Sequence, residues 1–222
     1  MIQLDVISHS NQAQKGKRLK QSHKLAVMVS GSGTLLEHMI GERLPISLVI
    51  AEKPCRGLDI ANAAGLATFL LARTGYGWDN TRRWDDQPDF KRAKFSLAVA
   101  EVLNARGITI TAMAGFMTIL APEFFTAYNG VLLNIHPSLL PKYKGERAVA
   151  DALEAGEKVT GTTVHIAIEE LDSGPIIEQA TVPIEPDDTV DSLHERIKQT
   201  ERPLYAQVLG ELLAGTRSLP PR

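Results

Sequence analysis

Short apolar runs alternate along this chain with longer stretches in which apolar residues recur every three to four positions. The runs are continuous, as in residues 25–29, and are bounded by glycine, proline or polar residues, which favours buried β-strands. This pattern predicts strands at residues 25–29, 46–51, 68–71, 108–113, 131–134, 162–168 and 176–184. The helical spacing predicts helices from residue 35 and over residues 57–64, 90–106, 147–155 and 188–213, with Pro203 as a candidate break.

Strands that alternate with helices are typical of an α/β fold. We therefore predict an open, mostly parallel, doubly wound (Rossmann-like) sheet with helices on both faces. Residues 24–222 are expected to form one domain. Residues 1–23 have few apolar positions, which predicts an N-terminal arm. Residues 73–89 are predicted to be a loop or insertion, which either packs on the surface, the favoured interpretation, or covers a ligand cleft.

Composition narrows the function classes. In 222 residues, 24 Lys and Arg are balanced by 26 Asp and Glu, so charge gives no case for nucleic-acid binding. The single cysteine, Cys55, excludes an internal disulfide and a multi-cysteine metal site. No apolar run reaches membrane-spanning length, and the N-terminus lacks the order of a signal peptide. A cytoplasmic protein with no membrane partner is expected.

Residue types suited to catalysis occur where the strand 131–134 is predicted to end. Asn134-Ile135-His136-Pro137 suits neither a helix nor a central strand, and alternation places Asn134 and His136 on the same side. Asp172 follows His136 by 36 residues, in a Leu-Asp-Ser-Gly turn. An amide donor, a titratable ring and a carboxylate can together manage a tetrahedral, oxyanionic intermediate. We predict that these three side chains form an active site.

A glycine-rich turn, Ser-Gly-Ser-Gly-Thr at residues 30–34, separates the first predicted strand from the first predicted helix. Such a turn can direct backbone N–H groups at a phosphate, although a tight turn without a ligand is an equally good interpretation of it alone. The turn matches neither the Walker sequence nor GxGxxG, so a monophosphate fits better than a dinucleotide.

From about Lys24 to Leu212 the chain resembles the folate-dependent formyltransferases. The resemblance rests on five motifs in the same order and spacing: SGSGT at 30–34, AGFMTIL at 114–120, NIHPSLLPKYKG at 134–145, GTTVHIAIEELDSGPII at 161–177 and KQTERPLY at 198–205. It implies the formyltransferase fold, with a phosphate and nucleotide side in the N-terminal half and a folate and catalytic side in the C-terminal half.

The resemblance also implies roles for individual residues. The catalytic ones are Asn134, His136 and Asp172. Those implied to bind the ribonucleotide are Ser32, Gly33, Thr34, Leu35, Gly115, Pro137, Lys198 and Glu201, with Lys198 and Glu201 meeting phosphate and ribose. Those implied to bind the folate are Arg92, near its tail, and Met117, Thr118, Ile119, Leu120, Asn134, Glu169, Glu170 and Asp172, around its pterin ring.

The reaction implied by the resemblance is transfer of the formyl group of 10-formyltetrahydrofolate to the amine of glycinamide ribonucleotide, in de novo purine (IMP) biosynthesis. Its partners would be these two small molecules, without a metal, on a monomer or homodimer. A formyltransferase for another amine, such as a nucleotide-linked amino sugar, is the main alternative. A formyltetrahydrofolate hydrolase and a methionyl-tRNA formyltransferase are weaker alternatives, because each of these classes carries a further domain that we do not expect in this chain. A non-enzymatic binding protein is also weaker, because it would leave the three catalytic residues unexplained.

Two departures keep the amino-sugar alternative open. Leu35 stands where the family commonly has an asparagine that hydrogen-bonds the phosphate. Residues 146–149 are Glu-Arg-Ala-Val, where the family usually has Leu-His-Thr-His. Both lie in the half of the site that is implied to hold the amine substrate.

Overall fold

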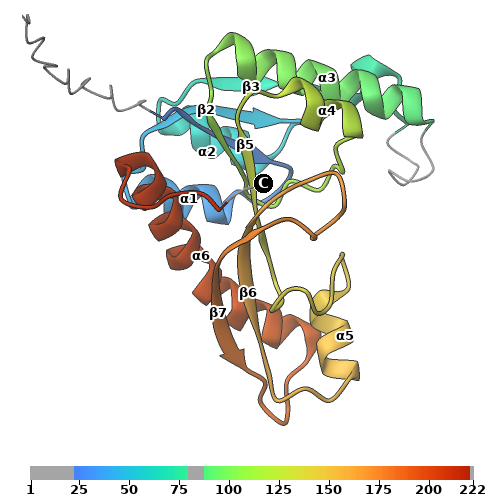
Figure 1. Cartoon of the computed structure of the whole chain (residues 1–222), viewed down its shortest axis with the longest axis vertical. Helices are drawn as coiled ribbons and strands as arrows, with labels where there is room; N and C mark the ends of the chain where they lie inside the picture. The colour runs from blue at the N-terminus through green and yellow to red at the C-terminus, as the bar shows by residue number, and fades with distance from the viewer. Residues whose placement is uncertain (1–22, 80–87, 221–222) are drawn as a thin grey trace, which may run out of the picture.

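A computed structural model describes residues 23–79 and 88–220 of the chain (Figure 1). Within these residues, seven strands form one sheet in the order β3-β2-β1-β4-β5-β6-β7. The strands are β1 (Leu25–Val29), β2 (Ile46–Ala51), β3 (Thr68–Leu70), β4 (Ile110–Met113), β5 (Val131–His136), β6 (Val159–Ile166) and β7 (Ile176–Pro183). The predicted N-terminal arm, apart from its last residue, lies outside the described residues.

The pairing directions confirm the predicted mostly parallel sheet. Strands β1 to β5 pair in parallel, whereas β6 pairs antiparallel with both β5 and β7. The chain builds outward from β1 in one direction to β2 and β3, and in the other to β4 and β5. The switch point therefore lies between β1 and β4, and a ligand crevice is expected beyond the carboxyl ends of these strands.

Helices cover both faces of the sheet, as predicted. They are α1 (Thr34–Gly41), α2 (Arg56–Ala63), α3 (Asp89–Ala105), α4 (Pro122–Ala127), α5 (Ala148–Glu154) and α6 (Val190–Ala214), with one 3-10 turn, η1 (Arg73–Tyr76). One core cluster joins the strands to Leu36 of α1, Ala61 of α2 and Tyr205 of α6. The cluster on the other face joins them to Phe95 of α3 and Phe124 of α4.

Helix α6 is continuous through Pro203, so the candidate break at this residue was wrong. A proline removes one intrahelical hydrogen bond, but apolar contacts continue on both sides of it, with Ile197 and Tyr205 fully buried. The Tyr205 hydroxyl also donates to the Leu133 carbonyl over 2.8 Å, which anchors the helix to β5. Packing against the sheet outweighs the local defect.

Two short elements were absent from the sequence-based pattern, α4 and η1. Each has fewer than two helical turns, which is too short for a periodic signal. In the segment 73–89, Trp78 is buried and its ring packs 5.9 Å from that of Phe95, in agreement with packing on the body of the protein. Residues 80–87, which include Trp84, lie outside the described residues.

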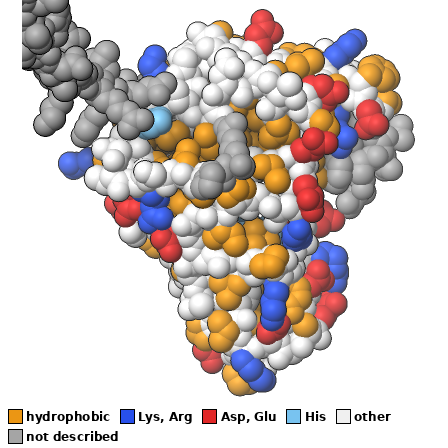
Figure 2. Space-filling model, viewed as in Figure 1, with side chains coloured by type: hydrophobic (Ala, Val, Ile, Leu, Met, Phe, Trp, Pro, Cys, Tyr) orange, Lys and Arg blue, Asp and Glu red, His pale blue; other side chains and the backbone are white. Residues whose placement is uncertain are grey.

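On the face drawn in Figure 2, acidic and basic side chains are intermixed and do not form a large patch of one charge sign. Across residues 23–79 and 88–220, no helix has the length and apolar character needed to cross a membrane.

Candidate active site

The end of β5 presents two of the predicted catalytic side chains. The strand runs to His136, two residues further than predicted, and Pro137 then removes the N–H that another ladder position would need. Asn134 lies opposite His165 of β6, and His136 lies opposite Thr163. Asn134 and His136 both point toward Asp172, which places them on the same side of the strand.

Asp172 contacts each of the other polar groups of the site. It lies in the loop between β6 and β7 in the left-handed region, with φ of 50°, and is 8% exposed. Its Oδ2 is 3.3 Å from Nδ1 of His136 and accepts a 2.9 Å hydrogen bond from the Gly145 N–H. Its Oδ1 accepts from Nδ2 of Asn134 over 3.5 Å. The structure thus brings Asp172 together with the two residues that precede it by 36 or more positions in the sequence.

A fourth side chain, His165, completes this cluster and was not identified from the sequence. Its Nε2 lies 3.3 Å from Nδ2 of Asn134 and 3.6 Å from Oδ1 of Asp172. Its Nδ1 is 3.1 Å from the Ile166 carbonyl. In the neutral ring, Nδ1–H donates to that carbonyl and leaves Nε2 to accept from the amide. His165 therefore fixes the orientation of Asn134.

The electrostatics of the cluster favour a charged Asp172 and a neutral His136. Burial alone would raise the pKa of Asp172, but the neighbouring rings of His165 and His136 and the hydrogen bond from the Gly145 N–H together hold it below its usual range. Burial lowers the pKa of His136, and the opposing effects of Asp172 and the Tyr143 carbonyl are smaller. At rest the imidazole is therefore neutral near pH 7.

In this neutral state only one ring nitrogen of His136 carries a hydrogen, which we assign to Nε2. Nε2 lies 2.8 Å from the Tyr143 carbonyl, to which it donates, and Nδ1 faces Asp172. Tyr143 itself has a φ of 54°, and its hydroxyl donates to Glu157 over 2.8 Å. The segment 141–145 consequently closes over the ring.

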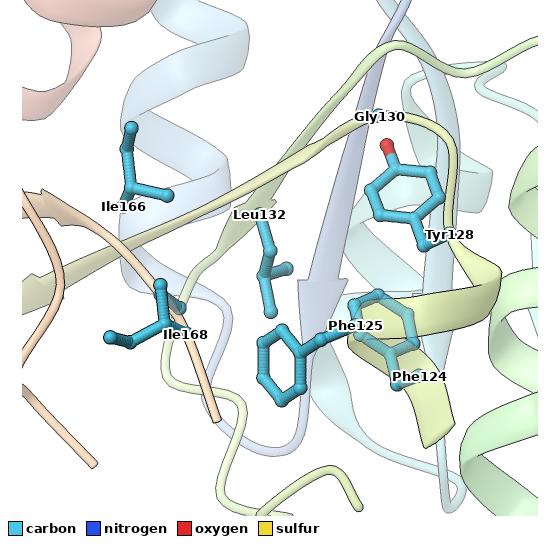
Figure 3. Close-up of a pocket in the computed structure, with 8 residues that line it drawn as sticks. Phe124, Phe125, Tyr128, Gly130, Leu132, Ile166 and Ile168 are labelled. Carbon is cyan, nitrogen blue, oxygen red and sulfur yellow. The ribbon is translucent and has the colours of Figure 1, made fainter. Parts of the chain in front are cut away.

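An apolar cavity of ≈ 160 Å³ opens beside the cluster (Figure 3). Leu132, two positions before Asn134 on β5, forms part of its wall, and Figure 3 shows this side chain directed toward the ring of Phe125. The full lining is Phe124, Phe125, Tyr128, Gly130, Leu132, Ile166, Ala167 and Ile168. Helix α4 begins two residues after the segment 117–120, and Ile168 directly precedes Glu169, so the lining of the cavity adjoins in sequence both segments expected to hold the pterin ring. Its own lining residues were not identified from the sequence.

The residues expected around the folate differ in their exposure and partners. Thr118 is 3% exposed and accepts from Nη1 of Arg73 over 3.2 Å, whereas Met117 is 66% exposed. Leu120 is buried, Ile119 is half-buried, and Glu169 and Glu170 are exposed. Arg92, on the first turn of α3, forms an ion pair of 3.2 Å with Asp89 and is not part of the catalytic cluster.

The glycine turn after β1 lies at the crevice. Gly33 caps α1 in the left-handed conformation, with φ of 70°, while Gly31 and Ser32 are exposed. The Ser30 hydroxyl accepts a 2.8 Å hydrogen bond from the N–H of Met117. This bond joins the turn expected to hold the phosphate to the loop expected to hold the folate. Gly115, in the same loop as Met117, also adopts positive φ, at 69°.

Helix α6 brings Lys198 and Glu201 toward the same crevice. Thr162 of β6 donates from its hydroxyl to Oε1 of Glu201 over 3.4 Å and lies 3.1 Å from the backbone carbonyl of His136. Lys198 pairs with Glu195 over 2.6 Å. Burial of its carboxyl raises the pKa of Glu201 to about 7, although Thr162, Lys198 and Arg202 oppose the shift.

This raised pKa predicts a pH-dependent gain in stability for Glu201→Gln. Between the unfolded pKa near 4.5 and the folded pKa of about 7, the folded protein keeps a proton that the unfolded chain releases, so stability falls as pH rises. Glutamine does not titrate. We expect the variant to match the parent near pH 4.5 and to exceed it by about 2–3 kcal/mol at pH 8. Urea unfolding at both pH values measures this difference, and an equal difference at both would contradict the assigned shift.

With fold and site described, comparison with known proteins defines the class. The model of the family described as formyl transferase matches residues 23–209, and the chain belongs to this family. Phosphoribosylglycinamide formyltransferase of Mycobacterium tuberculosis is 37% identical over 194 residues, which cover 85% of this chain and 84% of that protein. The enzyme of the same name from Haemophilus influenzae is 36% identical over 193 residues, or 84% and 85% of the two chains.

A longer relative and a solved structure are also similar to this chain. The human trifunctional purine biosynthetic protein adenosine-3 is 39% identical over 207 residues, and the match spans 90% of this chain but 19% of that protein. The crystal structure of glycinamide ribonucleotide transformylase 1 from Symbiobacterium toebii superposes with a TM-score of 0.77 at 34% identity, over 90% of this chain and 92% of that one.

Proposed function

We propose that this chain is an enzyme that transfers the formyl group of 10-formyltetrahydrofolate to the primary amine of glycinamide ribonucleotide, a step of purine biosynthesis. One observation carries the proposal. Asn134 and His136 converge on Asp172, with Nδ2 of Asn134 3.5 Å and Nδ1 of His136 3.3 Å from its carboxylate oxygens, and Leu132 of the same strand lines an apolar cavity. The relatives that share most of the chain's length carry the same activity in their names.

The two sides of the cluster suit two different substrates. The cavity beside Leu132 is lined mainly by aromatic and aliphatic side chains, which suits a flat heteroaromatic ring such as a pterin. The glycine turn, with its helix N-terminus, and Glu201 suit a phosphate and ribose hydroxyls. A formyl group carried on the first ligand then meets an amine carried on the second at Asn134 and His136.

In the proposed mechanism the amine nitrogen attacks the formyl carbon, and the carbonyl electron pair moves to oxygen. Nδ2 of Asn134 donates to that oxyanion, and one such donor is typically worth about 3 kcal/mol. His136 turns an N–H from the Tyr143 carbonyl toward the same oxygen. The charged Asp172 accepts the proton that the attacking nitrogen loses. The oxyanion then re-forms the carbonyl as the bond between the formyl carbon and the folate nitrogen breaks, and that nitrogen takes up the proton held by Asp172.

The test follows formyl loss from 10-formyltetrahydrofolate with purified protein, with and without glycinamide ribonucleotide. Loss that requires the ribonucleotide supports the proposal. Loss without any amine would instead assign a hydrolase. No loss with the ribonucleotide, together with loss when a nucleotide-linked amino sugar is supplied, would assign the alternative that Leu35 and residues 146–149 keep open.

A further inference from the structure

The glycine turn is held against the start of α2. A Cβ on Gly33 would lie 2.6 Å from the Cα of Gly57, closer than real Cβ atoms approach, so two glycines allow this contact. The Gly57 N–H donates to the Gly31 carbonyl over 3.0 Å. The first turn of α2 is therefore fixed relative to the N-terminus of α1, and the backbone of the preceding residue, Arg56, is fixed with it.

Arg56 reaches from this helix onto the turn. Its Nη1 donates to the Ser32 carbonyl over 2.9 Å, and its Nη2 lies 3.4 Å from Oε2 of Glu37. The side chains of Arg56 and Glu37 are each 56% exposed, so the guanidinium remains open to solvent and to a ligand. A guanidinium has five N–H donors, and these two contacts leave most of them available.

The charges around the turn favour a cation as a further contact for a bound phosphate. The first N–H groups of a helix have no acceptor inside it, so those following Gly33 are open to an anion. Glu37 lies in the first turn of the same helix and would repel that anion. Leu35 offers no side-chain hydrogen bond, and Lys198 is engaged by Glu195 over 2.6 Å. Arg56 offsets Glu37 and adds donors at the edge of the turn.

We propose that Arg56 is a phosphate-recognition residue of this chain, which binds the phosphate monoester of the ribonucleotide together with the turn 30–34. The inference rests on the proposed function for the identity of the ribonucleotide. It assigns to α2 a part in substrate binding, and it supplies a phosphate contact in a chain that carries leucine at position 35.

Three substitutions separate charge from a structural role. Arg56→Ala removes the guanidinium, Arg56→Gln keeps a donor for the Ser32 carbonyl without charge, and Arg56→Lys keeps charge. Lys53→Ala is the matched control, because Lys53 is an exposed cation three residues before Arg56, in the loop between β2 and α2. Each protein is assayed for kcat and for the KM of both substrates, and its affinity for ribose 5-phosphate is measured by calorimetry.

We expect Arg56→Ala and Arg56→Gln each to raise the KM for glycinamide ribonucleotide about tenfold, which corresponds to about 1.4 kcal/mol. Affinity for ribose 5-phosphate should fall in parallel, Arg56→Lys should recover part of both losses, and kcat and the folate KM should stay within about twofold of the parent. Lys53→Ala should resemble the parent. An unchanged KM in Arg56→Ala, full recovery in Arg56→Gln, or equal weakening for the phosphate-free riboside would overturn the proposal.

Calorimetry separates this inference from the proposed function. If the parent protein binds ribose 5-phosphate and Arg56→Ala binds it about tenfold more weakly, the phosphate site stands even where glycinamide ribonucleotide is not formylated. If the parent turns over the ribonucleotide and Arg56→Ala does so with the same KM, the proposed function stands and the role of Arg56 is wrong.

Discussion

Asp172→Asn is expected to lower kcat at least about 10³-fold while the protein still folds. The two carboxylate oxygens of Asp172 face His136 and the Gly145 N–H on one side, and Asn134 and His165 on the other. An asparagine supplies one acceptor oxygen, so its NH₂ group must face either the Asn134 amide or the Gly145 N–H, both of which are donors. The change also removes the charge that takes up the proton, and losses of about 10²–10⁴ are typical for such groups.

Steady-state kinetics at saturating ribonucleotide measure this effect, and near-ultraviolet circular dichroism checks the fold. Asp59→Asn is the matched control, because Asp59 is an exposed carboxylate on α2. It should keep parental kcat. A kcat for Asp172→Asn within about tenfold of the parent would remove Asp172 from the mechanism.

Gly174→Ala is expected to reduce both stability and activity. Gly174 is buried two residues after Asp172, where its Cα packs against β6. A Cβ there would overlap the Ile166 carbonyl oxygen and lie 3.3 Å from Cγ2 of Ile168. The Ile166 N–H also donates to the Pro175 carbonyl over 2.9 Å, so the loop and the strand cannot separate without losing this bond.

The added methyl group must push the loop away from β6 and carry Asp172 with it. We expect a loss of about 3 kcal/mol in unfolding free energy, within the range for overpacking. A displacement of about 1 Å at a catalytic group costs about 10²-fold in rate. Gly41→Ala, with no atom within 4 Å of the added carbon, is the control and should keep both quantities. Parental activity in Gly174→Ala would show that the loop tolerates the shift.

The fold follows from local pattern, and part of the site follows with it. Alternation along residues 131–136 is a local property, so the sequence by itself places Asn134 and His136 on the same side of a strand. The mostly parallel sheet follows from strands alternating with helices. The predicted helix break at Pro203 was wrong because the lost hydrogen bond is a local effect that the sequence shows. The burial of Ile197 and Tyr205, which outweighs it, depends on tertiary contacts that the sequence does not show.

The rest of the site depends on contacts between distant segments. His165 joins the cluster because β6 pairs antiparallel with β5, in a register that sets it opposite Asn134. Nothing in the sequence near His165 encodes that register. The cavity is similarly assembled from α4, β5 and the segment after β6. Arg56 reaches the glycine turn because Gly33 and Gly57 approach each other closely. The sequence around either glycine does not predict this contact with the other.

The hydrogen bond between the Ser30 hydroxyl and the Met117 N–H joins the two halves of the crevice, and this has a thermodynamic consequence. A ligand that immobilises the glycine turn also restricts the loop after β4, so the second ligand loses less conformational entropy when it binds. Linkage requires the effect to be mutual: each ligand tightens the other by the same factor. In Ser30→Ala the two binding free energies should become additive, and calorimetric titration of each ligand with the other present or absent measures that coupling.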